Sequence, residues 1–324
     1  MSMMQASAKR KLKTFARLGV LSASVAAVLS GCALFKAAQR PPESVTVAKT
    51  PERVARGEYL ATTVMSCVGC HSPLSESHGL VPGKEWSGGR LFGKADGLPG
   101  NIYSTNLSSD PETGLGSWTD GEILRAMREG VSKDGTALFP LMPYPGYHQM
   151  SDEDAHSIVA YLRTLPALKA SHPKRELDFP LSLIVNTIPK PLEKPVAPPA
   201  ADPVSRGKYL ATMASCTDCH TPMEKGQPVM EKYFSGGNKF TEHGHTVVVS
   251  NITQDKTTGI GAWTDAQIER AIRFGQRPDG RMLSPIMPWM AYNRMSNDDM
   301  KALIQYLRTV PAVSSEKPKT TAHS

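Results

Sequence analysis

The residues in this 324-residue sequence that are best suited to chemistry are two copies of the pattern Cys-x-x-Cys-His, at residues 67–71 and 216–220. In this spacing two thiols can bond covalently to the vinyl groups of a porphyrin, and the adjacent histidine then faces the iron as an axial ligand. Each copy therefore predicts the attachment of one c-type haem, so we expect two haems. The predicted attachment residues are Cys67, Cys70, Cys216 and Cys219, and the predicted iron ligands are His71 and His220.

The two motifs lie in similar halves of the chain, offset by 149 residues at the cysteines and by 145 further along. The recurring segments are Arg56-Gly57-Glu58-Tyr59-Leu60 and Arg206-Gly207-Lys208-Tyr209-Leu210, Ser87-Gly88-Gly89 and Ser235-Gly236-Gly237, Asn106 and Asn251, and Trp118-Thr119-Asp120 and Trp263-Thr264-Asp265. Such self-similarity indicates a duplicated domain. The alternatives for a Cys-x-x-Cys pair are a structural zinc site, a disulfide and a thioredoxin-like redox motif. The repeat favours haem over all three.

A haem with one histidine ligand needs a second ligand for outer-sphere electron transfer, and a methionine thioether raises its reduction potential relative to a second imidazole. Met142 and Met287 occupy equivalent positions, and each precedes a proline that prevents a helix from forming there. We therefore predict them as the second axial ligands. Met150 and Met295 also recur, but they directly precede a helix cap, where a hydrophobic staple is the simpler role.

The sequence gives less support for other iron ligands. The remaining histidines do not recur at equivalent positions; they are His78, His148, His156, His172, His243, His245 and His323. Either His243 or His245 could still replace Met287 and lower the potential of the second haem, the alternative being a solvated loop. Trp118 and Trp263 do recur, and they either donate an indole N–H to a haem propionate or pack in the core.

Each half contains three helical patterns in the same order, which must position these residues. The first leads into the motif, over about 51–67 and 203–216, with proline at its start. The second begins at the capping boxes Thr119-x-x-Glu122 and Thr264-x-x-Gln267 and ends at Gly130 and Gly275. The third begins at Ser151-x-x-Asp154 and Ser296-x-x-Asp299 and ends before Pro166 and Pro311. Few segments compete as strands, the exception being 246–250, so we expect an all-α fold.

The expected organisation is two tandem haem domains joined by a proline-rich connector. The predicted parts are a signal peptide over 1–31, a tether over 32–50, a first domain over 51–168, a connector over 169–202, a second domain over 203–312 and a disordered tail over 313–324. The connector also contains an apolar segment from Phe179 to Ile188. This segment packs either between the domains or against a partner.

The N-terminus predicts export. A basic stretch precedes an apolar run from Leu18 to Leu29, which suits a signal peptide and is too short to span a bilayer. The run ends in Leu29-Ser30-Gly31-Cys32, which resembles the lipobox of bacterial lipoproteins. Cys32 is therefore predicted to be lipidated, the alternative being an ordinary signal peptide with a chance cysteine. We expect the mature protein in the bacterial periplasm, held on a membrane by its lipid.

The charge of the chain argues against a nucleic-acid partner. The formal net charge is +7, but residues 1–31 hold five basic residues and no acidic one, so the mature chain is nearly neutral. No basic cluster interleaved with aromatic residues remains.

After the signal peptide, no stretch reaches the roughly 18 apolar residues that a membrane-spanning helix needs.

The repeated segments, over about 51–168 and 203–312, resemble the cytochrome c subunits of bacterial membrane-bound alcohol, aldehyde and gluconate dehydrogenases. The resemblance implies a class I type cytochrome c domain in each repeat. It implies that His71 and Met142 bind the first iron and His220 and Met287 the second. It also implies an exported dehydrogenase as electron donor, and a quinone, an oxidase or another cytochrome as acceptor. Members of that family commonly hold three haems, whereas this chain carries two motifs.

The function that the sequence favours is electron transfer along the respiratory chain, with no catalytic centre in the chain itself. The main alternative is a dihaem peroxidase, which would need one iron with an open position and a nearby acid or base. A methionine followed by proline in both halves argues against it. A third reading, a zinc-stabilised binding module without haem, predicts a colourless protein.

Overall fold

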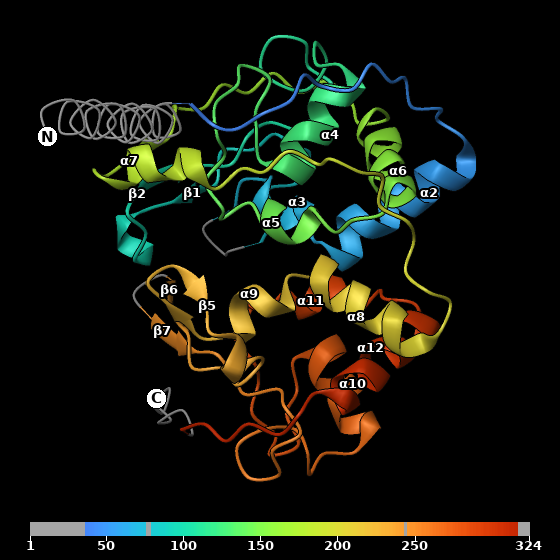
Figure 1. Cartoon of the computed structure of the whole chain (residues 1–324), viewed down its shortest axis with the longest axis vertical. Coiled ribbons are helices and arrows are strands. Elements are labelled where there is room, and N and C mark those ends of the chain that lie inside the picture. The colour runs from blue at the N-terminus through green and yellow to red at the C-terminus, as the bar shows by residue number, and fades with distance from the viewer. Residues whose placement is uncertain (1–35, 76–78, 243–244, 317–324) are drawn as a thin grey trace, which may run out of the picture.

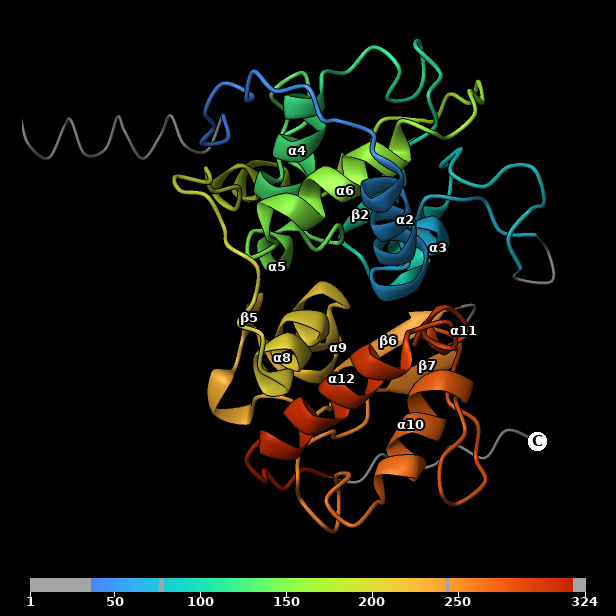
Figure 2. The same cartoon turned by 90° about the vertical axis from the view of Figure 1, so that its right-hand side faces the viewer.

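The computed structural model describes residues 36–75, 79–242 and 245–316. Figure 1 shows the two repeats stacked along the long axis, the first coloured from blue to green and the second from yellow to red, and the quarter turn of Figure 2 shows the same division. Several predictions of the sequence fall outside the described residues: the signal peptide, the lipidated Cys32, His78, His243, His323 and the end of the C-terminal tail.

The helix that leads into each motif begins as predicted but ends earlier. Its parts are α2 (Pro51–Tyr59), the π-helical turn η1 (Leu60–Val64) and α3 (Cys67–Cys70) in the first repeat, and α8 (Pro203–Met213) and α9 (Cys216–His220) in the second. Ser66 and Ser215 adopt left-handed backbone angles, with φ of 49° and 56°. Such a residue cannot continue a right-handed helix. Each motif therefore turns away from the helix before it, in the same manner in both repeats.

The other two predicted helices are present in both repeats. They are α4 (Asp120–Glu129) and α6 (Asp152–Leu162) in the first repeat, and α10 (Asp265–Phe274) and α12 (Asn297–Thr309) in the second. The capping boxes at Thr119 and Thr264 form with both of their hydrogen bonds, and α4 and α10 end at left-handed Gly130 and Gly275. Short helices follow each Met-Pro pair, namely α5 (Tyr144–Tyr147) and α11 (Trp289–Tyr292).

In each repeat the helix before the motif crosses the last helix at a glycine. A Cβ added at Gly57 of α2 would lie 1.8 Å from the carbonyl oxygen of Ser157, and one at Gly207 of α8 would lie 2.0 Å from that of Ala302. No side chain fits such a gap, so glycine sets the distance between the two helices. The crossing therefore sets where the chain leaves the helix pair and enters the haem motif.

The Gly57→Ala variant is expected to be less stable than the wild type. Alanine favours a helix by about 1 kcal/mol over glycine, but forcing extra atoms into a packed contact costs about 1–3 kcal/mol or more. A steric overlap this close places the variant at the upper end of that range. The measurement is the free energy of unfolding in denaturant. Gly79→Ala is the matched control, because its Cβ would meet its nearest neighbour at 3.8 Å. Equal stability of the Gly57→Ala and Gly79→Ala variants would contradict the close crossing.

The all-α expectation is wrong, because the described residues are 36% helix and 9% strand and contain several small sheets. The first sheet has the order β1 (Leu91–Phe92), β2 (Gly100–Tyr103) and β3 (Glu176–Leu177), and two hairpins pair β4 (Met223–Glu224) with β5 (Gln227–Pro228) and β6 (Lys239–Glu242) with β7 (His245–Val248). All pairs are antiparallel. The longer strands lie in the loop after each motif, where the two repeats differ in length. The segment predicted as an exception, 246–250, does contribute to β7.

The connector packs against the first repeat. It holds β3, the short helix α7 (Leu181–Ile184) and the turn η3 (Val185–Thr187). Val185 is buried in a small cluster with Ala37, Val131 and Ala137, whereas Phe179 is 81% exposed. The apolar segment therefore divides between packing and solvent. In the part of the chain that the structure describes, none of the helices combines the length and apolar character needed to cross a bilayer.

Candidate haem sites

The motif histidines are held in the same way in both repeats. Nδ1 of His71 lies 2.8 Å from the carbonyl oxygen of Thr105, and Nδ1 of His220 lies 2.8 Å from that of Ser250. A carbonyl oxygen only accepts hydrogen bonds, so Nδ1 carries the proton and the lone pair is on Nε2. Burial lowers the pKa of both imidazoles and keeps them neutral. Each Nε2 can therefore bind a metal, and the carbonyl fixes the orientation of the ring.

The Ser-Gly-Gly segments close over these histidines. Gly88 and Gly236 donate their backbone N–H to the carbonyl of the motif histidine in their own repeat, at 2.9 and 2.7 Å. Their φ angles are +73° and +70°, and a Cβ at either would lie 2.6 Å from Thr105 or 2.5 Å from Ser250. Glycine is needed because this segment must touch the backbone that orients the histidine. The small sheets matter here, since Thr105 and Ser250 closely follow β2 and β7.

The recurring asparagines explain how that backbone is held. Asn106 and Asn251 directly follow the two residues whose carbonyls face the histidines. Each side-chain amide donates to one threonine hydroxyl and to one backbone carbonyl beyond the last helix of its repeat; the acceptors are Thr113 and Leu168 in the first repeat and Thr258 and Val313 in the second. The asparagine thus ties the loop that positions the histidine to the end of the domain.

The motif cysteines are thiols and are not joined in disulfides. Burial raises the pKa of Cys67 and of Cys216 to about 12, and that of Cys219 to about 11. Burial therefore favours the neutral form of these three thiols. Among the described residues, no group of three or more His, Cys, Asp or Glu could hold a metal ion.

The predicted methionine ligands lie in two turns of the same geometry. The carbonyls of Met142 and Met287 each accept a hydrogen bond, at 2.7 Å, from the N–H two residues further on. Both side chains are partly buried and pack against the hydrophobic core. Met150 and Met295 are only 0% and 3% exposed within that core, which agrees with the packing role assigned to them. Iron ligation by Met142 and Met287 stays a prediction.

Comparison with protein families gives the decisive observation. The family model for cytochrome c matches the chain twice, at residues 54–166 and 204–311. The chain belongs to the cytochrome c family. The two matched regions correspond to the two repeats, and each contains one of the histidine sites described above.

Several curated relatives of this cytochrome c are named as cytochromes c or as cytochrome c subunits. The chain is 28% identical to the cytochrome c subunit of a quinone-dependent alcohol dehydrogenase from Gluconobacter oxydans, over 82% of this chain and 56% of the relative. It is 31% identical to the gluconate 2-dehydrogenase cytochrome c subunit of Pantoea cypripedii, over 80% and 60%. It is also 27% identical to a dihaem c-type cytochrome of Cereibacter sphaeroides, over 66% and 73%. The chain therefore spans somewhat more than half the length of the two dehydrogenase subunits.

The residues of this cytochrome c fit covalently bound haem. Imidazoles whose Nδ1 is bound by a backbone carbonyl, together with thiols at the attachment spacing, supply the donor set. In addition, the indole Nε1 of Trp289 is buried and has no hydrogen-bond partner among the described residues. An unsatisfied buried N–H costs about 1–3 kcal/mol, so an acceptor group brought in by a cofactor would stabilise it.

The other candidate residues either have contacts of their own in the structure or keep predicted roles that the structure does not test. His148 and His172 contact backbone carbonyls, of Arg128 at 3.2 Å and of Ser87 at 2.6 Å. Trp118 and Trp263 pack, partly buried, against the core, and their bonding to a propionate is still a prediction. The side chain of His245, like the whole of His243, lies outside what the structure describes.

Sequence reasoning missed three functional positions. It did not single out Thr105 and Ser250, because they act through their backbone carbonyls and any residue type can supply one. The available signal was the recurring asparagine beside each of them. Trp289 was missed because the first repeat has Tyr144 at that position, whose hydroxyl already donates to the carbonyl of Leu138 at 3.3 Å.

Proposed function

We propose that this protein is a dihaem cytochrome c that transfers electrons. The haems are attached through Cys67 and Cys70 and through Cys216 and Cys219, with His71 and Met142 as axial ligands of the first iron and His220 and Met287 as those of the second. The observation that carries the proposal is the duplicated bond between the histidine Nδ1 and a backbone carbonyl at 2.8 Å. That bond leaves an oriented, neutral Nε2 at each attachment motif.

The residues of each repeat suit outer-sphere electron transfer. A bound haem supplies an iron that accepts and releases one electron. The histidine, oriented by its backbone carbonyl, and the methionine, held in a turn beside proline, would be the two protein ligands of the iron, and with both bound no position would be left for a small molecule. No general acid or base is required, because no proton moves with the electron. A peroxidase would need one of these positions open.

The proposed donor is an exported dehydrogenase, and the proposed acceptor is a quinone, an oxidase or another cytochrome of the respiratory chain. Relatives named as cytochrome subunits of alcohol and gluconate dehydrogenases support a dehydrogenase as partner. The relative described as a dihaem c-type cytochrome supports two haems per chain.

We also propose that the protein is held on a periplasmic membrane surface through a lipid on Cys32. Ala37 follows Cys32 by five positions, and an extended chain spans at most about 18 Å over five residue steps. Because Ala37 is packed against Val131 and Val185, the first repeat is the part that would lie next to the bilayer.

The Cys32→Ser variant is expected to move from the membrane fraction to the soluble periplasmic fraction of the exporting host. A lipid anchor contributes about 0.8 kcal/mol per buried methylene, and no described helix could replace it. The measurement is immunoblotting of the separated fractions, with haem content as the control for folding. A variant that stays on the membrane while folded would refute lipid anchoring at this residue.

The function itself is tested by spectroscopy of the protein matured in an exporting host. We expect two equivalents of covalent haem per chain, two low-spin irons and a reversible change on one-electron reduction, without turnover of hydrogen peroxide. A high-spin iron together with peroxide turnover would support the peroxidase alternative. A colourless protein, or one equivalent of iron, would refute the dihaem proposal.

A further inference from the structure

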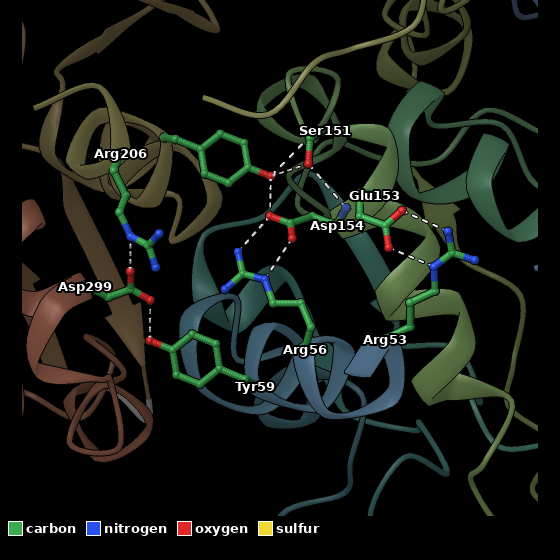
Figure 3. Close-up of polar contacts among 9 residues, drawn as sticks. Arg53, Arg56, Tyr59, Ser151, Glu153, Asp154, Arg206 and Asp299 are labelled. Carbon is green, nitrogen blue, oxygen red and sulfur yellow. Dashed lines mark hydrogen bonds and ion pairs between the residues drawn. The ribbon is translucent and has the colours of Figure 1, made fainter. Parts of the chain in front are cut away.

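The two repeats are joined by a pair of reciprocal hydrogen bonds that involve tyrosine and aspartate (Figure 3). The hydroxyl of Tyr59 in the first repeat donates to Asp299 Oδ2 of the second at 2.7 Å. The hydroxyl of Tyr209 in the second repeat donates to Asp154 Oδ2 of the first, also at 2.7 Å. Since these residues are equivalent in the duplication, the same contact is made twice in opposite directions, as in a two-fold symmetric interface.

Each aspartate is also bound by an arginine of its own repeat. Arg56 contacts Asp154 through two hydrogen bonds of 2.8 and 2.9 Å, and Arg206 contacts Asp299 at 2.6 Å. Asp154 and Asp299 are 8% and 1% exposed. A buried carboxylate is stable only when it is paired and its oxygens accept hydrogen bonds. The arginine supplies the charge from within the repeat, and the tyrosine supplies the remaining bond from the other repeat.

The tyrosine hydroxyls also accept hydrogen bonds from the other repeat. The N–H of Ser296 lies 3.1 Å from the hydroxyl of Tyr59, and that of Ser151 lies 3.3 Å from the hydroxyl of Tyr209. These serines cap α12 and α6. Each tyrosine therefore binds the first turn of a helix in the opposite repeat through both its proton and its lone pair.

This arrangement explains why the Arg-Gly-x-Tyr and Ser-x-x-Asp segments recur together in both repeats. Arg-Gly-x-Tyr places arginine and tyrosine three residues apart, on neighbouring positions of one helix surface. Ser-x-x-Asp caps the last helix and also presents the aspartate. In both repeats the arginine joins the two helices of one domain, the glycine lets them cross closely, and the tyrosine reaches the other domain. We name the set of Tyr59, Asp299, Tyr209 and Asp154 the tyrosine–aspartate clasp.

The tyrosines of the clasp lie on α2 and α8, the helices that lead into the haem attachment motifs. Tyr59 is the last residue of α2, and the chain continues through η1 into the motif at Cys67. The first repeat also approaches α8, the helix before the second motif, because a Cβ added at Gly146 of α5 would lie 3.7 Å from the carbonyl oxygen of Thr212. Arg294 of the second repeat also donates to the carbonyl of Thr62 at 2.8 Å. The segments that lead into the two motifs, η1 and α8, therefore both contact the opposite repeat in the orientation that the clasp holds.

We propose that the tyrosine–aspartate clasp is a positioning device that holds the two haem domains in the orientation needed for electron transfer between their haems. This inference rests on the proposed function, since it requires a haem in each repeat. The clasp residues do not touch the iron ligands. They act by fixing the distance and angle between the two attachment sites.

The test is the Tyr59→Phe/Tyr209→Phe double variant of the haem-loaded protein, which removes the two hydroxyls and keeps both rings. We expect two low-spin haems and unchanged axial ligation, together with loss of the split Soret circular dichroism that arises from two coupled haems. We also expect a larger radius of gyration in solution scattering. Each single variant keeps one of the two tyrosine–aspartate bonds and is expected to lose only part of the Soret splitting.

Tyr306→Phe is the matched control. Its hydroxyl bonds to Tyr233 at 3.0 Å within the second repeat, so its loss removes a tyrosine hydrogen bond without touching the interface between the repeats. An unchanged dichroism and radius in the double variant would overturn the clasp, and so would an equal loss of splitting in Tyr306→Phe. If the double variant fails to mature, the single variants decide the outcome by the same criteria. A wild type without two haems would instead refute the proposed function.

Discussion

Changing Cys216 and Cys219 to serine is expected to lower the covalently bound haem from two equivalents per chain to one. The motif, its histidine and the carbonyl of Ser250 that orients that histidine all belong to the second repeat. The first repeat has its own complete set, so it retains its haem. The measurement is the haem absorbance after denaturation, relative to protein concentration, and it should fall by half.

The reciprocal change of Cys67 and Cys70 to serine should give the same stoichiometry with the haem in the second repeat. The Cys32→Ser variant is the control, because it also removes cysteine but should keep both haems. Retention of two covalent haems in either double variant would show that attachment uses other residues. Loss of both haems from one double variant would show that the repeats do not mature independently.

The helices could be predicted because their ends depend on neighbouring residues. The capping boxes at Thr119 and Thr264 and the stops at Gly130 and Gly275 are local signals, and the structure contains all of them. The sheets could not be predicted in this way. Strands β1 and β3 are two residues long, too short for a periodic pattern. Moreover, β3 pairs with β2 although the connector brings it from more than seventy residues further along the chain.

The break before each motif was missed for a different reason. Serine has no special preference for left-handed angles, yet Ser66 and Ser215 both adopt them. Both serines lie where the motif begins, after the preceding helix has crossed its partner helix at Gly57 or Gly207. Such a conformation is imposed by tertiary structure and costs about 1–3 kcal/mol.

The haem sites likewise combine residues that the sequence predicts with partners that it does not. The attachment cysteines and the histidines are set by a covalent spacing, so the sequence predicts them directly. The partners that orient the histidines are backbone carbonyls 34 and 30 residues further along the chain. The clasp could not be predicted either. Arg-Gly-x-Tyr and Ser-x-x-Asp can be recognised as repeats, but neither segment indicates that the tyrosine binds the opposite repeat.

Replacing Met142 by alanine is expected to remove about half of the thioether-to-iron charge-transfer band of the oxidised protein and to lower the reduction potential of the first haem. Methionine ligation raises the potential of a histidine-ligated haem, so its loss favours the oxidised state. Met287→Ala should have the same effect on the second haem. The measurements are the near-infrared side of the oxidised spectrum and a redox titration of each variant.

Met150→Leu and Met295→Leu are the matched controls, because leucine keeps the volume of these buried side chains and removes only the sulfur. Both controls should retain the whole band. Loss of the band from a control, with retention in Met142→Ala or Met287→Ala, would move the ligand assignment to the residues before the helix caps.

The same pair of variants also identifies the direction of electron flow within the chain. A one-electron potential difference of about 59 mV changes the equilibrium between two haems tenfold, so a modest shift at one site reverses the order of reduction. If Met142→Ala reverses that order and Met287→Ala strengthens it, the first haem has the higher potential in the wild type. Electrons would then enter at the second repeat and leave from the first, the repeat closest to the proposed lipid anchor and hence to a membrane-bound acceptor.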